Sequence, residues 1–158
     1  MTTDIENVKK YVRAANYISA AQIFLQNNFL LENKLSFDDI KPRLLGHWGT
    51  CPGINFVYAH LNYLIKKHNA NFMFVLGPGH GFPALQANLY IEGTLGKYYP
   101  EATWNNQGSP STSSGNILPE PVEGIHNHSN PSTSSGNIYN SLAYLIKNFS
   151  WPYGFPSH

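Results

Sequence analysis

The sequence is poor in charged residues. Asp, Glu, Lys and Arg make up only 12% of its 158 residues, against roughly 25% in typical soluble domains. The net charge of +1 gives neither the basic footprint of a nucleic-acid-binding protein nor a polybasic membrane-binding segment. Cys51 is the single cysteine, so an internal disulfide framework is excluded. So few charges suggest a surface that further protein covers.

Long apolar runs are missing as well. No stretch approaches the roughly 20 residues that span a bilayer, and the N-terminus has no apolar segment of the kind found in secretory signal peptides. We therefore expect a cytoplasmic protein without a membrane or nucleic-acid partner. The chain does have 42% hydrophobic residues, enough for one domain with a real core.

Helical periodicity marks the first part of the chain. It predicts a helix from residue 3 to about residue 27, with Thr3 as N-cap and Glu6 at capping-box spacing. A short helical start is expected at 36–39, where Pro42 ends it.

A second helix is predicted at 52–68. Pro52 suits the first helical position, Cys51 would be the N-cap, and Asn69 would end the helix. Its apolar side chains recur at helical spacing and form one stripe, which consists of Ile54, Val57, Leu61, Leu64 and Ile65.

A buried β-strand is expected at 72–76, where five apolar residues are followed directly by Gly77, Pro78 and Gly79. The pattern of a helix then returns at 83–92. Helix, strand, glycine turn and helix in this order are typical of an α/β layer with parallel strands.

Residues 105–137 are rich in Asn, Ser, Gly, Pro and Thr and almost lack large apolar side chains. The sequence PSTSSGNI occurs in them twice, at 110–117 and 131–138. A solenoid repeat would need apolar positions in each unit, so we interpret 105–137 as a flexible low-complexity insertion. A last helix is predicted at about 139–149.

Two glycine-flanked histidines are candidates for chemistry. Residues 77–81, GPGHG, would follow a strand and open a helix, where backbone N–H groups can approach an anion. Residues 46–53, GHWGTCPG, could place the imidazole of His47 over a pocket. The structural alternative for 77–81 is a tight turn with a surface histidine. For 46–53 it is a loop whose Trp48 packs into the core and whose His47 is solvated.

The other histidines and the cysteine carry weaker signals. His126 and His128 lack a third ligand nearby, so no metal site is predicted. His60 and His68 are expected at the surface of the second helix, and Cys51 is interpreted as structural. From the residues alone, the chain is an α/β domain with a possible anion pocket and no identifiable reaction.

Five collinear segments together resemble the phosphoketolases. They are YVRAANYIS at 11–19, KPRLLGHWGT at 41–50, PGINF and AHLN within 52–62, GPGHG at 77–81 and the terminal PSH. The resemblance covers about residues 8–100 and 139–158. It implies an incomplete thiamine-diphosphate-binding fold, like the N-terminal domain of transketolases.

The resemblance also implies a site and a reaction. Its catalytic residues would be His47, His80 and His158, which move protons at the sugar hydroxyls and stabilise the intermediate as water leaves. Gly77, Gly79 and Gly81, with His80, would let the cofactor approach closely. The family cleaves xylulose 5-phosphate or fructose 6-phosphate with inorganic phosphate, as a homodimer that uses thiamine diphosphate and Mg²⁺.

The sequence departs from the family pattern in three ways. The family lacks the stretch at 105–137, and WPYG at 151–154 replaces the family's PGG before His158. The Gly-Asp-Gly motif that holds magnesium on the cofactor is absent from this sequence, and so is the later glutamate that activates the cofactor.

We therefore expect residues 1–158 to be a truncated N-terminal phosphoketolase domain, an aldehyde-lyase fragment that is inactive alone and needs a missing C-terminal part or second chain. The alternatives are a non-catalytic remnant of an interrupted gene and a stand-alone anion-binding module.

Overall fold

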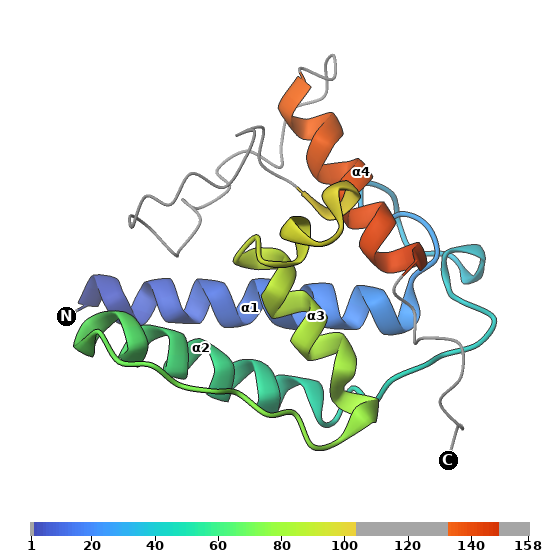
Figure 1. The fold of residues 1–158 in the computed structure, drawn as a ribbon. Coiled ribbons are helices and arrows are strands. Elements are labelled where there is room, and N and C mark those ends of the chain that lie inside the picture. The colour runs from blue at the N-terminus through green and yellow to red at the C-terminus, as the bar shows by residue number, and fades with distance from the viewer. Residues whose placement is uncertain (1, 104–132, 149–158) are drawn as a thin grey trace.

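The computed structural model describes residues 2–103 and 133–148, and this part of the chain is helical. Helices α1 (Thr2–Phe24) and α2 (Cys51–His68) run antiparallel, and α3 (Phe82–Ile91) crosses both (Figure 1). Each of these three helices packs against the other two. Helix α4 (Thr133–Asn148) lies against α1. Short 3₁₀ helices occur at Phe37–Asp39, Gly79–Gly81, Leu95–Lys97 and Pro100–Ala102.

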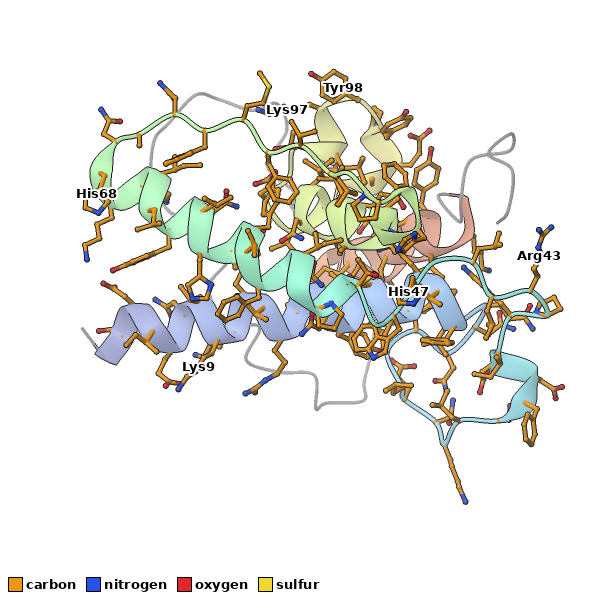
Figure 2. All side chains as sticks on the ribbon, turned by 90° about the horizontal axis from the view of Figure 1, so that it is seen from below. Lys9, Arg43, His47, His68, Lys97 and Tyr98 are labelled. Atoms are coloured by element: carbon orange, nitrogen blue, oxygen red, sulfur yellow. The ribbon has the colours of Figure 1, made fainter. Side chains whose placement is uncertain are left out.

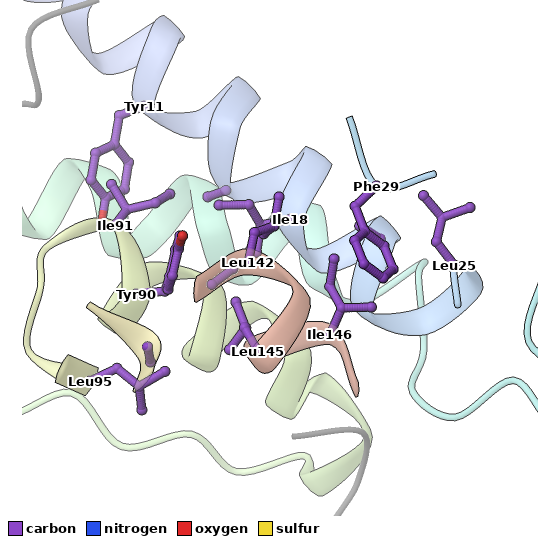
Figure 3. Close-up of a cluster of buried hydrophobic side chains, with 14 of the residues drawn as sticks. Tyr11, Ile18, Leu25, Phe29, Tyr90, Ile91, Leu95, Leu142, Leu145 and Ile146 are labelled. Atoms are coloured by element: carbon purple, nitrogen blue, oxygen red, sulfur yellow. The ribbon is translucent and has the colours of Figure 1, made fainter. Parts of the chain in front are cut away.

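The main core lies where α3 and α4 meet α1 (Figure 3). Helix α1 contributes Tyr11, Ala15 and Ile18, which are spaced by four and three residues and therefore share one face. Burial of such a face supplies most of the stability of an amphipathic helix. The partners from the other elements are Ala59, Ala87, Tyr90, Ile91, Leu95, Leu142, Leu145 and Ile146.

Helix α4 is held by two polar contacts besides its apolar face. The Tyr90 and Ser141 hydroxyls are hydrogen-bonded at 2.7 Å. The Lys41 ammonium donates to the carbonyl of Gln22 (2.6 Å) and to that of Ile146 (3.0 Å). These carbonyls lie in the last turns of α1 and α4, where helices leave backbone acceptors unpaired. Lys41 thus joins the ends of two helices that are far apart in sequence.

The first helix differs from its prediction at both ends. It begins at Thr2, so Thr3 lies inside it, and Glu6 accepts a hydrogen bond from Lys9 instead of closing a capping box. It ends at Phe24 because the chain then pairs with residues 39–41: the Gln26 N–H donates to the Asp39 carbonyl. The predicted short helical start is confirmed as Phe37–Asp39.

Helix α2 confirms the prediction for 52–68 but not its details. Thr50, not Cys51, is the N-cap, and Asn69 ends the helix in a left-handed conformation with φ 48°. The predicted apolar stripe faces the core only in part: Ile54 packs against a buried cluster, whereas Val57 and Leu64 are 49% and 40% exposed. The buried face consists of Cys51, Asn55, Tyr58 and Ala59.

The prediction of a buried strand at 72–76 is wrong for this structure. The segment is extended, but the described part of the chain has no strand, and Met73 and Val75 are 90% and 78% exposed. Phe74 packs its ring edge-on against Tyr58, with centroids 5.1 Å apart. A strand needs a neighbour to accept its backbone hydrogen bonds, and within residues 2–103 and 133–148 none lies beside this segment. The predicted α/β class is therefore not confirmed.

The last two predicted helices are both present. Helix α3 matches the expected 83–92 closely, whereas α4 begins at Thr133, earlier than the predicted 139. Residues 133–137, the end of the proposed insertion, are helical. The rest of the proposed insertion lies outside the described residues. No helix in the described ranges has the length and apolar character to cross a membrane.

A buried polar network ties the three main helices together. Asn55 of α2, which is fully buried, donates to Asn16 Oδ1 (2.8 Å) and to Ser19 Oγ (3.1 Å), both on α1. Its own Oδ1 accepts from Asn88 Nδ2 of α3 at 2.7 Å. Buried amides are costly unless they are paired, so this network fixes how α1, α2 and α3 sit against one another.

We therefore predict that Asn55→Leu, which keeps the side-chain volume, lowers the free energy of unfolding by about 2–3 kcal/mol. The leucine removes the hydrogen bonds that Asn55 makes to the Asn16 amide, the Ser19 hydroxyl and the Asn88 amide in a buried place. The matched control is Asn71→Ala at an exposed position, expected to change stability by less than about 0.5 kcal/mol. Urea unfolding measures both, and equal midpoints for the two variants would contradict the network's importance.

Candidate functional site

Two of the predicted histidines lie side by side. The backbone N–H of His47 donates to the carbonyl of His80 at 2.9 Å. The two imidazole rings are 5.1 Å apart between centroids and meet edge to face, with planes inclined by 70°. Both residues are exposed. His47 lies near the N-terminal end of α2, whereas His68 lies at its opposite end (Figure 2).

Gly46 lets the first turn approach the helices. Its φ of +113° is a conformation that L side chains rarely adopt. A Cβ atom built there would lie 2.9 Å from Ile23 Cγ1 of α1 and 2.9 Å from Pro83 Cγ of α3. A glycine is therefore required immediately before His47 for both conformation and space.

Gly49 makes room for the His47 ring. A Cβ at this position would meet His47 Cε1 at 2.9 Å, so the imidazole lies folded back over the glycine. The ring nitrogen Nδ1 then reaches the hydroxyl of Thr50 at 2.6 Å. The His47 carbonyl also accepts from the N–H groups of Thr50 (3.1 Å) and Cys51 (3.3 Å). The orientation of His47 is thus fixed from both its side chain and its backbone.

The glycines of the second turn have different surroundings. Gly81 is buried, and a Cβ there would overlap Ile54 Cδ1 of α2. Gly77 is exposed and has open space where a Cβ would stand. Packing therefore accounts for Gly81, whereas no contact from the described residues requires a glycine at 77.

The N-terminus of α3 has no free donors for an anion. The N–H of Gly81 bonds to the Pro78 carbonyl, and that of Phe82 bonds to the Gly79 carbonyl. Pro83 has no N–H, and the Ala84 N–H is hydrogen-bonded to the sulfur of Cys51. Burial raises the pKa of the Cys51 thiol, in keeping with a structural role. The first backbone donors of α3 are therefore already used within the described chain.

Backbone donors remain free just before that helix. Between residues 71 and 77, no backbone N–H makes a backbone hydrogen bond within the described chain. The free N–H and open space at Gly77 lie on the same turn as His80. A free N–H beside open space leaves room for a phosphate to approach the backbone. Within 2–103 and 133–148, no three His, Cys, Asp or Glu side chains converge on one point.

The remaining predicted site residues fall in two groups. His158, His126 and His128 lie outside the described residues. His60 is a half-exposed residue of α2 whose Nδ1 bonds to the Phe56 carbonyl at 2.7 Å. Thr50, whose hydroxyl contacts His47 Nδ1, was missed by sequence reasoning, although its position three residues after His47, beyond a glycine, is a usable signal.

Comparison with known proteins shows which family the chain is similar to. The family model described as "XFP N-terminal domain" matches residues 1–140. The chain is 57% identical over 98 residues to "Probable phosphoketolase 2" of Rhizobium meliloti, covering 62% of this chain and 13% of that protein. It is 41% identical over 154 residues, 98% of this chain, to "Probable phosphoketolase" of Rhodopseudomonas palustris. A "Probable phosphoketolase" of Pseudomonas putida is 41% identical over 157 residues.

These relatives are much longer than this chain. The chain spans only 13% to 16% of their length.

We predict that Gly46→Ala destabilises the protein by at least about 2 kcal/mol, because the methyl group is overpacked between α1 and α3 and the φ is unfavourable. The matched control is Gly53→Ala in the first turn of α2, where a Cβ has open space. That variant should gain about 0.5–1 kcal/mol from the better helix former. Thermal unfolding compares the two, and a stable Gly46→Ala would show that the turn tolerates a side chain.

Proposed function

The chain belongs to the phosphoketolase family, of which it represents the N-terminal domain, and we propose that it forms the histidine-bearing side of a phosphoketolase active site. The observation that carries the proposal is the placement of His47 and His80, whose exposed rings lie 5.1 Å apart. In this proposal the complete protein is a cytoplasmic homodimer that cleaves xylulose 5-phosphate or fructose 6-phosphate with phosphate. The products are acetyl phosphate and an aldose phosphate.

The chemistry divides between the cofactor and the protein. Thiamine diphosphate, when bound, supplies the carbon nucleophile that cleaves the sugar. The imidazoles of His47 and His80 hold and move protons at the sugar hydroxyls. Histidine suits this task because it exchanges protons near neutral pH. His158 is proposed as the third such residue.

The cofactor would lie against the second turn. The free N–H and open space at Gly77 give a phosphate or ring room to approach the backbone, and Gly79 and His80 continue the same surface. Gly81 supports this surface from below by packing on α2. The remaining length of the protein would supply the Mg²⁺ ligands and the cofactor-activating glutamate.

The exposure of the extended segment at 72–76 supports the proposal that further protein packs against this domain. The segment exposes Met73 and Val75, and Val57 and Leu64 of α2 are exposed as well. No Asp, Glu, Lys or Arg occurs between Lys67 and Glu92, so the segment has none of the charges that protect free strand edges. We propose that the rest of a full-length phosphoketolase covers it and completes an α/β fold around it.

The anion-binding alternative is less well supported. An anion module built on 77–81 would use the N-terminus of α3, whose first N–H groups are already bonded or absent. The family motif in this loop is better explained if the loop forms part of the site beside His80.

The site assignment is tested in a chimaera that joins this chain to the remaining length of the Pseudomonas putida relative. His47→Ala and His80→Ala should each lower turnover of xylulose 5-phosphate about 100-fold or more, as for other catalytic imidazoles. His68→Ala is the matched control, at an exposed site on the far end of α2, and should leave turnover unchanged. Normal turnover in both His47→Ala and His80→Ala would refute the assignment.

The chain alone, purified as 158 residues, should release no acetyl phosphate from xylulose 5-phosphate in the presence of thiamine diphosphate, Mg²⁺ and phosphate. The expected reason is the absence of a metal motif and of the activating glutamate. A colorimetric acetyl phosphate assay detects the product, with the active chimaera as positive control. Turnover by the isolated chain would contradict the proposal that the site needs further protein.

A further inference from the structure

The hydroxyl of Thr50 bonds to one specific nitrogen of His47. The distance from Thr50 Oγ1 to His47 Nδ1 is 2.6 Å. A neutral imidazole carries its proton on either Nδ1 or Nε2, and the partner of one nitrogen decides the state of the other. Thr50 therefore controls which hydrogen-bonding group His47 offers to its surroundings.

The direction of this hydrogen bond follows from the position of Thr50. Thr50 is the N-cap of α2, and its side chain makes no capping hydrogen bond. Helix N-termini carry a partial positive charge that favours acceptors over N–H donors. An unprotonated Nδ1 is therefore preferred at this place, and the Thr50 hydroxyl donates its proton to it.

The other ring nitrogen is left for a ligand. With Nδ1 as acceptor, the neutral ring carries its proton on Nε2. Across the described residues, Nε2 of His47 has no hydrogen-bond partner, and the residue is exposed. We propose that Thr50 is a positioning residue that holds His47 as the Nε2–H tautomer, so that His47 presents a hydrogen-bond donor to the oxygen of a bound substrate.

The role of this donor rests on the proposed function, since Nε2–H can bind a substrate oxygen only if the substrate lies beside His47. The tautomer itself is measured without any turnover. If His47→Ala and His80→Ala in the chimaera both kept normal turnover, the proposed function would fail, whereas the tautomer result would stand.

The test is long-range ¹H–¹⁵N NMR of the 158-residue chain at a pH where the imidazoles are neutral. The expected spectrum shows His47 with an unprotonated Nδ1 and a protonated Nε2. His60 is an internal control of opposite sign, because its Nδ1 faces the Phe56 carbonyl at 2.7 Å. A carbonyl only accepts, so His60 should be protonated at Nδ1.

Three variants separate positioning from folding. Thr50→Val keeps the shape and removes the hydroxyl, so the two His47 nitrogen shifts should move toward each other as both tautomers become populated. Thr50→Ser should restore the wild-type pattern. Gly49→Ala keeps the hydroxyl but pushes the ring away from it, and should give the same change as Thr50→Val.

The His60 signals should stay constant in every variant, which reports that α2 remains folded. A protonated Nδ1 at His47 in the wild-type chain would overturn the proposal. So would unchanged His47 shifts in Thr50→Val or Gly49→Ala.

Discussion

The two histidines stand together because α1, α2 and α3 approach one another closely at one point. Ile23, Cys51 and Ala84, one from each helix, form a small buried cluster there. Small side chains and the glycines at 46 and 81 leave room for two turns to pack into the junction. The hydrogen bond from the His47 N–H to the His80 carbonyl then joins the turns directly. Substitutions that open this junction should therefore separate the imidazoles without touching either ring.

The domain also exposes apolar side chains on its outer surface. The helices bury a polar network around Asn55 on their inner faces, while α2 turns Val57 and Leu64 outward. The extended segment after α2 adds Met73 and Val75 to this surface. A surface of this kind is expected of a domain that is covered by more protein. The relatives, of which the chain spans 13% to 16%, have the length to provide that cover.

Local signals predicted the positions of the helices well. Pro52 at the first turn of α2 and Asn69 at its end identified that helix almost to the residue. The buried face of α2 could not be predicted. Apolar periodicity predicts that Val57 is buried and Asn55 exposed, and it does not show that Asn16, Ser19 and Asn88 lie opposite Asn55. The prediction of a strand at 72–76 failed for a related reason. A strand forms only beside a neighbouring strand, and the described residues do not contain one.

The site was predicted in part. The family resemblance and the glycine-flanked turns identified His47 and His80, and the structure brings these two together. Thr50 was missed because its link to His47 depends on the ring folding back over Gly49. That contact depends on the folded conformation of the turn, although the two residues are close in sequence. At the start of α3 the backbone donors bond to Pro78, Gly79 and Cys51, a detail that the glycine pattern of 77–81 does not reveal.

The central claim is that this chain supplies one side of a phosphoketolase cofactor site. Calorimetric titration of thiamine diphosphate with Mg²⁺ tests it most directly, using the remaining length of the Pseudomonas putida relative as a separate polypeptide. The account predicts no measurable binding to either polypeptide alone and saturable binding to the two together. Equal binding to the remaining polypeptide with and without this chain would contradict the claim.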